Sequence, residues 1–295
     1  MSSDGRVRPF WRMVFWLFCF ILLTAAGSLA IGPLPRTSME WGGTLVLTAA
    51  AIVAGWISLM RLDNRPASAL GLGRSRSSVL RFLTGFGVGG ALIAGAALLL
   101  LVTGAFSFLP DTGSPVRLIW FFTWTLLFFA ISALFEEAIF RGYPFQVLVE
   151  WIGVWPAIAI ASGIFALMHG RNPGITTLAA VNIFLAGVLL SLAYLRTLSL
   201  WFATGVHLGW NWVMAGPFDF PVSGIAFDAP MYSGDVRGAA LWTGGDFGPE
   251  AGLVSTVVLA AGIVWLLRTR RLSPSEDALA GPPLTLEHAR ESGLL

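Results

Sequence analysis

The sequence contains no lysine, so all 18 of its basic Lys and Arg residues are arginine. Charged residues of either sign make up only 12% of the 295 residues, whereas 56% are hydrophobic. The mean hydropathy is +0.77. This composition is typical of integral membrane proteins and excludes an ordinary soluble globular domain. The net charge of +2 is small, and we expect no nucleic-acid partner.

Cysteine is also nearly absent, since Cys19 is the single one in the chain. One cysteine excludes an intrachain disulfide. It lies in the first apolar run, residues 13–31, which follows a basic start. This run is long for the core of a signal peptide, so we interpret it as a retained first membrane helix.

The familiar motifs of several membrane hydrolases are missing. There is no HExxH pattern of a helix-borne zinc protease. "PVSGIA" and "IASGIF" lack the glycine that precedes a serine nucleophile in G-x-S-G. "GGDFG" (244–248) contains Asp246, but no second membrane aspartate exists to pair with it. Serine and aspartyl mechanisms are therefore disfavoured.

Long apolar runs dominate the rest of the chain, and they predict an all-α polytopic integral membrane protein with about eight transmembrane helices. We expect three helices in an N-terminal region (1–116), a catalytic core (117–216), an exterior loop (217–250), a last helix (251–267) and a flexible tail (268–295). The loop is interpreted as solvated rather than as a lid. The predicted helices cover 13–31, 43–60, 82–104, 118–135, 155–168, 178–195, 200–216 and 251–267.

Arginine is unevenly distributed between the segments that connect these runs. With the N-terminus inside, four arginines lie outside, Arg36, Arg117, Arg171 and Arg237, and the other fourteen lie inside. Inside loops of membrane proteins are enriched in Lys and Arg. The sequence therefore predicts that both termini are cytoplasmic, in a plasma (inner) membrane.

Three charged residues interrupt the fourth apolar region in "LFEEAIFRG" (134–142). A charge at the centre of a membrane helix costs roughly 2.5 to 3.5 kcal/mol on the insertion scale. Glu137 and Arg141 are spaced i and i+4, so they share a helix face and can pair. Glu136 points about 100° away. Either the helix ends at Phe135 and the charges lie at the interface, or Glu136 is a free buried carboxylate.

Two histidines lie in the following apolar helices. His169 ends "FALMH", and a hairpin that turns near 150–155 brings it level with Glu136. His207 and Asn211 in "HLGWN" share one face of the seventh helix. Separately, each residue is explained as helix packing or interhelical hydrogen bonding. Together they predict an active site between helices four, five and seven.

Two chemistries fit this set of side chains. A shielded carboxylate beside an imidazole can activate water for attack on an amide, while His and Asn donors stabilise the oxyanion. Alternatively, Glu136, His169 and His207 form a three-ligand zinc site with an open position for water. The residues alone leave both open.

These motifs resemble those of a known family. "EEAIFR", "FALMH" and "HLGWN" are similar, in order, to the E-E-x-x-x-R, F-x-x-x-H and H-x-x-x-N motifs of the CAAX protease and bacteriocin-processing family. The resemblance implies an intramembrane endopeptidase, like the type II CAAX prenyl endopeptidases. It implies that Glu136 and His169 activate water, that Glu137 and Arg141 form a supporting pair, and that His207 and Asn211 hold the oxyanion.

The resemblance also sets expectations for cofactors and partners. We favour a metal-free mechanism, with zinc as the alternative. The expected partners are a peptide or lipidated protein substrate and membrane lipid. Two other functions fit the same buried polar residues: a non-hydrolytic scaffold or immunity factor, and a proton-coupled transporter.

Overall fold

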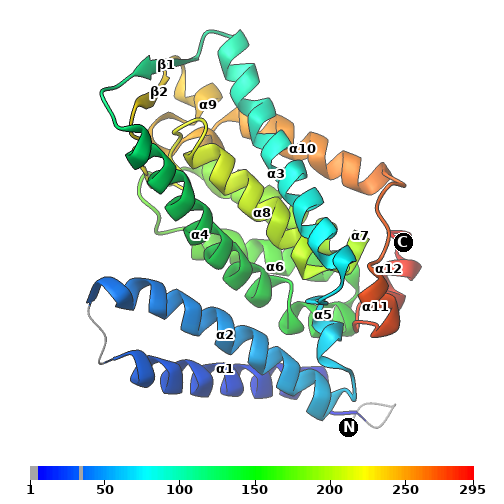
Figure 1. Ribbon diagram of the computed structural model, residues 1–295. Coiled ribbons are helices and arrows are strands. Elements are labelled where there is room, and N and C mark those ends of the chain that lie inside the picture. Colours follow the sequence, from blue (N-terminus) through cyan, green and yellow to red (C-terminus); the bar gives the residue numbers. More distant parts are fainter. Residues whose placement is uncertain (1–5, 33–35) are drawn as a thin grey trace.

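The computed structural model describes residues 6–32 and 36–295, and helices make up most of it (Figure 1). The elements, in order, are α1 (Pro9–Ile31), α2 (Arg36–Leu62), α3 (Arg76–Val102), β1 (Phe106–Pro110), α4 (Pro115–Phe140), α5 (Tyr143–Ile152), α6 (Val154–Met168), α7 (Thr177–Thr197), α8 (Leu200–Ala215), β2 (Tyr232–Val236), α9 (Ala240–Thr243), α10 (Leu253–Arg268), α11 (Glu276–Ala280) and α12 (Leu286–Glu291), with short 3-10 turns at Ala67–Leu70, Gly245–Phe247 and Pro249–Ala251.

The predicted all-α membrane fold is confirmed. The eight apolar runs correspond to α1, α2, α3, α4, α6, α7, α8 and α10. Among the described residues, five helical segments are long and apolar enough to cross a membrane. The helices α6, α8 and α10 have 15, 16 and 16 residues. They are shorter than the roughly 20 residues that a spanning helix needs.

The fourth apolar region is broken where the charged motif ends. Helix α4 stops at Phe140, and α5 begins at Tyr143. Pro144, in the first turn of α5, has no N–H to donate to the carbonyl of Phe140, so α4 does not continue through it. The first turn of a helix tolerates proline, because the N–H groups there have no partner within the helix. Arg141 therefore lies at the C-terminus of α4, and the chain turns there before reaching α6.

Helix α8, which carries His207 and Asn211, packs closely against α3. A Cβ atom on Gly89 would overlap the carbonyl oxygen of Val206, and one on Gly205 would overlap that of Phe82. Glycine at these positions lets the two backbones approach each other, as in other membrane helix pairs. The contact fixes α8 in the middle of the layer formed by α3, α4 and α8 (Figure 1).

A buried polar cluster attaches the α1–α2 hairpin to α5. Arg12 of α1 forms ion pairs with Asp63 at 2.6 Å and with Glu150 at 2.9 Å. The Tyr143 hydroxyl donates to Asp63 at 2.8 Å. Arg12 is only 2% exposed, so its charge is balanced by carboxylates from two other elements rather than by water.

Residues 268–295 differ from the flexible tail that the sequence predicts. Asp277 accepts hydrogen bonds from Ser75 at 2.6 Å and Ser78 at 2.8 Å, and these bonds hold the pKa of Asp277 below its ordinary value. The Ser275 N–H donates to Thr197 O. The apolar side chains of the segment also bury themselves, including Ala278, Leu286, Ala289 and Leu294. The sequence of this segment is polar overall, so its few apolar residues did not predict that it would pack.

The predicted exterior loop is also folded. Strand β2 pairs antiparallel with β1, and Phe106 lies opposite Val236. Asp219 accepts from the N–H groups of Ala229 and Gly234. These long-range partners, more than 100 residues apart in the case of the strands, hold the segment against the helices.

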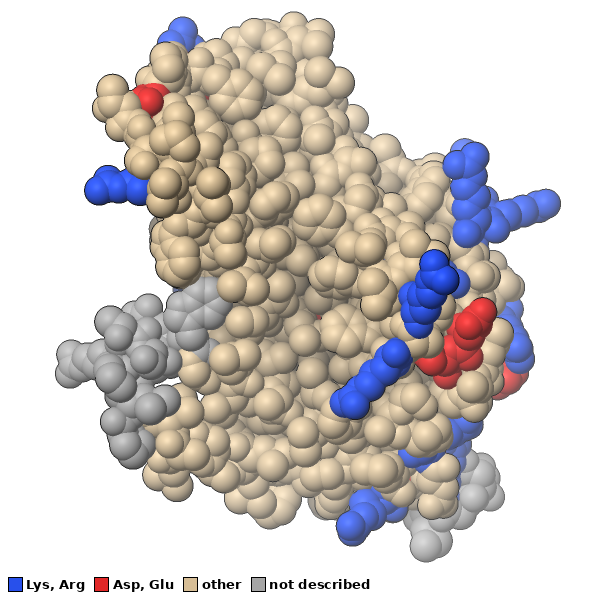
Figure 2. Space-filling view, in the orientation of Figure 1, with Lys and Arg blue, Asp and Glu red and all other residues tan. Residues whose placement is uncertain are grey.

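In the view of Figure 2, arginine side chains gather toward one end of the molecule. In the view of Figure 2, most blue side chains lie over the end where α3 begins and α10 ends, and few lie near β1 and β2. A wide surface without charge separates the two ends in this view. This arrangement suits a molecule whose middle contacts lipid.

The polar cluster around Arg12 gives a first prediction. Arg12→Met removes the cation that lies 2.6 Å from buried Asp63 and leaves only Arg6, at 4.0 Å. Breaking a buried ion pair typically costs about 3 to 5 kcal/mol. We expect a clearly lower melting temperature in detergent. Arg8→Met is the matched control, because Arg8 is exposed. Equal melting temperatures of the two variants would contradict a stabilising role for the cluster.

Candidate active site

A cavity of about 690 Å³ lies between α4, α6, α7, α8 and the segment that follows α8. Its walls are mainly aromatic and aliphatic, with Phe128, Phe129, Phe140, Phe165 and Ile164 among them. Four residues predicted for the site line it: Glu136, His169, His207 and Asn211. They come from three separate helical regions, so the fold brings together what the sequence separates.

His207 lies between the two adjacent glutamates. Its Nδ1 is 2.9 Å from Glu137 Oε1 and donates to that carboxylate. Its Nε2 is 3.8 Å from Glu136 Oε2. Glu136 has no partner within its own helix, but the fold places His207 at ion-pair distance from it. The imidazole therefore links the buried carboxylate to the one that faces the cavity.

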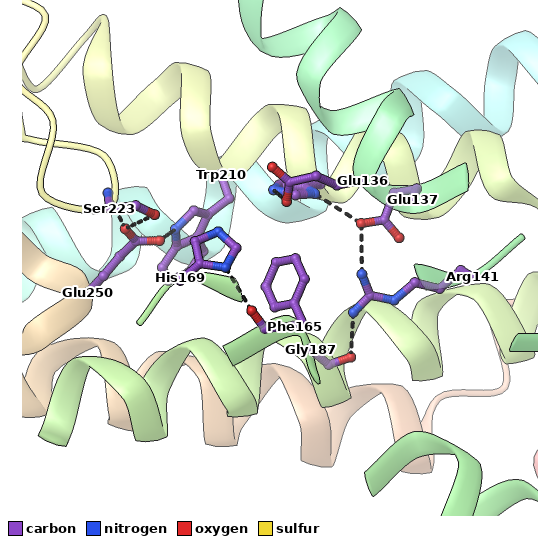
Figure 3. A network of polar contacts seen from close by, with 10 residues as sticks. Glu136, Glu137, Arg141, Phe165, His169, Gly187, Trp210, Ser223 and Glu250 are labelled. Carbon is purple, nitrogen blue, oxygen red and sulfur yellow. Dashed lines mark hydrogen bonds and ion pairs between the residues drawn. The ribbon is translucent and has the colours of Figure 1, made fainter. Parts of the chain in front are cut away.

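Glu137 and Arg141 form the predicted pair behind the cavity wall (Figure 3). Arg141 Nη1 donates to Glu137 Oε1 at 3.1 Å, and its Nη2 donates to Gly187 O at 2.8 Å. Both side chains are fully buried. The guanidinium also lies over the Phe165 ring, 5.1 Å from its centroid, an arrangement that favours a cation.

Helix α4 continues to Phe140, so it does not end at Phe135 as one of the two alternatives required. Glu137 and Arg141 are 0% exposed, and the side chain of Glu136 is 27% exposed into the cavity wall. A pair at the aqueous surface would be open to solvent. Glu137 and Arg141 therefore belong to the protein interior, whereas Glu136 faces the cavity.

His169 caps the C-terminus of α6. Its Nδ1 lies 2.8 Å from Phe165 O in the preceding turn. A carbonyl only accepts, so Nδ1 carries a proton, and Nε2 is the ring nitrogen left for other partners. His169 and Phe165 rings are 4.6 Å apart. The i, i+4 spacing of the motif thus orients the imidazole from its own helix.

Sequence reasoning missed several cavity residues, among them Trp210, Ser223 and Glu250. Glu250 was assigned to a solvated loop, yet it is only 9% exposed. Trp210 Nε1 donates to Glu250 Oε1 at 3.1 Å, and Ser223 N–H donates to Glu250 Oε2 at 2.6 Å. The local signal was weak, because a glutamate among glycines and prolines resembles any exposed loop.

The predicted zinc site is not assembled by these side chains. Among the side chains of residues 6–32 and 42–295, no group of three or more His, Cys, Asp and Glu is placed to hold a metal ion. The Nδ1 atoms of both site histidines are directed at protein acceptors, so Nε2 is the ring nitrogen that each has free. Glu136, His169 and His207 are therefore not brought together as a zinc site, and the reaction proposed for this chain uses side chains alone.

Residues 118–213 match the family model described as type II CAAX prenyl endopeptidase Rce1-like. This segment resembles that family. The match covers α4 to α8, about a third of the chain, and contains all six predicted site residues. The resemblance inferred from the three motifs is confirmed over these residues. No curated protein matches the chain. Glu250 lies outside the Rce1-like segment.

The buried pair behind the cavity gives the second prediction. Arg141→Ala leaves Glu137 without its main cation in the interior, which typically costs about 3 to 5 kcal/mol. We expect reduced expression and a lower melting temperature in detergent. Arg171→Ala is the control, because Arg171 is exposed.

The combined change Glu137→Gln and Arg141→Met removes both charges, so it should destabilise less than Arg141→Ala. Normal melting of Arg141→Ala would contradict the stabilising role of the pair.

Proposed function

We propose that this protein is an intramembrane endopeptidase that hydrolyses a peptide bond in a lipidated or hydrophobic peptide, in the manner of CAAX-processing enzymes. The observation that carries the proposal is the shared cavity of Glu136, His169, His207 and Asn211, whose other walls are mainly apolar. Such walls accept a hydrophobic substrate and keep bulk water away from the polar groups. The similarity of residues 118–213 to prenyl endopeptidases points to the same class.

In the proposed reaction, Glu136 is the general base. It accepts a proton from a water molecule as the water oxygen attacks the scissile carbonyl carbon, and His169 orients that water through its Nε2 lone pair. The C–N bond then breaks, and the proton held by Glu136 passes to the leaving nitrogen. One water is consumed, and a carboxylic acid and an amine are formed.

Charge balance supports His207 as a donor to the oxyanion. The buried set contains two carboxylates, Glu136 and Glu137, and one arginine, Arg141. A protonated His207 makes the set neutral, which lowers the cost of burying it. Its Nε2–H then faces the cavity beside Glu136, and Asn211 one turn further along α8 supplies a second donor.

The orientation follows from the arginine distribution. We propose that the Arg-rich end, where α3 begins and α10 ends, is cytoplasmic (Figure 2). His169 then lies toward the exterior end of α6, because the turn after α6 contains only Arg171. The membrane would be the plasma (inner) membrane.

The third prediction concerns Glu136. Glu136→Gln keeps the shape of the side chain but cannot accept the proton, so cleavage should fall by at least about 100-fold, within the range typical of general base catalysis. The assay is mass spectrometry of a mixed library of prenylated and unmodified hydrophobic peptides, incubated with purified folded protein.

Products from the wild type alone would support a glutamate-dependent peptidase and would reveal the bond that is cut. Retained turnover by Glu136→Gln would exclude Glu136 as the base. No products from folded wild type would favour the scaffold or transport function.

The fourth prediction concerns metal dependence. Dialysis against a strong chelator should leave cleavage unchanged, because the proposed steps use only side chains. Loss of activity that zinc restores would contradict the metal-free mechanism and favour a site that forms only with substrate.

A further inference from the structure

The carboxylate of Glu250 joins three parts of the chain at the rim of the cavity. Its Oε1 accepts from Trp210 on α8, and its Oε2 accepts from both the backbone N–H and the hydroxyl of Ser223, at 2.6 and 3.1 Å. Both oxygens are thus bonded, and the residue is 9% exposed. Figure 3 shows this network beside His169. A buried carboxylate with this many donors is a strong and directional link.

The turn that Glu250 holds lies in the cavity wall. Val222 and Ile225 exchange two backbone hydrogen bonds around Ser223 and Gly224, and Val222, Ser223 and Ile225 all line the cavity. Ser223 has φ of 51°, in the left-handed region that non-glycine residues rarely adopt. Such conformations cost of order 1 to 3 kcal/mol and persist where surrounding contacts hold them. The Glu250 bonds are such contacts.

The same turn is bonded to the segment that carries His169. Asn172 Nδ2 donates to Ser223 O at 3.0 Å, and Asn172 N–H donates to His169 O at 3.0 Å. On the other side, Trp210 is three residues after His207 and one before Asn211 on α8. A chain of hydrogen bonds therefore runs from α8 through Glu250, Ser223 and Asn172 to His169.

We infer that Glu250 is a positioning residue of the active site. The Glu250 clamp, defined as Glu250, Trp210, Ser223 and Asn172, holds the His169 turn at a fixed position relative to α8. It thereby sets where the imidazole of His169 lies with respect to His207 and Asn211. This assignment rests on the proposed peptidase function, and it gives residues outside the Rce1-like segment a part in the reaction.

The experiment compares Glu250→Gln with Asp246→Asn in the full chain in detergent. Asp246 lies in the same loop and is exposed, so it controls for loss of a loop charge. In Glu250→Gln one carboxylate oxygen is replaced by an NH₂ group, which donates hydrogen bonds and cannot accept them. The side chain therefore loses either the bond from Trp210 or the bonds from Ser223. Hydrogen–deuterium exchange is measured for peptides that cover 220–227 and 169–176.

The clamp predicts faster exchange in both peptides for Glu250→Gln and in neither for Asp246→Asn. Faster exchange confined to 220–227, or no change in either peptide, would overturn the link to His169. This readout needs no substrate, so it tests the clamp even if the wild type cleaves no peptide and the proposed function fails.

Kinetics test whether the link matters for the reaction. For a peptide that the wild type cleaves, Glu250→Gln should lower kcat by about 10-fold to 100-fold, the size expected for a small misplacement of a catalytic group. KM should change less than kcat, since the apolar walls remain. If Glu250→Gln changed the melting temperature but kept the kcat of Asp246→Asn, Glu250 would have only a structural role.

Asn172→Ala provides the second variant. It removes the side-chain bond from Asn172 Nδ2 to Ser223 O, while the Glu250 carboxylate keeps its donors. If both residues act through one path, the double variant should be no slower than the slower single variant. If the fold-decreases in kcat of the two single variants multiplied in the double variant, the two residues would act independently, and the inference would be overturned.

Discussion

The carboxylate of Glu137 is the contact on which the site depends. It accepts from Arg141 at 3.1 Å and from His207 at 2.9 Å in a fully buried position. An unpaired carboxylate there would be costly, so the residue requires both donors nearby. Since Arg141 also binds Gly187 on α7, this one group joins α4, α7 and α8.

The geometry of the cavity follows from that junction. His207, held by Glu137 through Nδ1, directs its other nitrogen toward Glu136. Gly89 of α3 lies close to the backbone of α8, and Gly205 of α8 lies close to the backbone of α3. These contacts fix the position of α8 against α3. The break before Pro144 ends α4 at Phe140, and Arg141 caps its C-terminus. Packing, helix termination and charge balance thus act on the same few residues.

The cavity is lined by the segment after α8 as well as by helices. Its turn at Ser223 forms part of the wall, and Glu250 binds this turn to α8. If the proposed clamp acts as inferred, regions outside the Rce1-like segment tune a shared site. Loops of this kind vary readily while the rigid helices keep the reactive groups in place.

The sequence by itself determined the helical membrane class, because a mean hydropathy of +0.77 and 20-residue apolar runs leave few alternatives. The i, i+4 spacing also determined the Glu137–Arg141 pair, since helix geometry is local. Only the tertiary structure decided that His207 bridges the glutamates, that Glu250 reaches Trp210, and that residues 275–294 pack. These contacts join residues 40 or more positions apart, and no local pattern encodes which distant partner a buried polar group will meet.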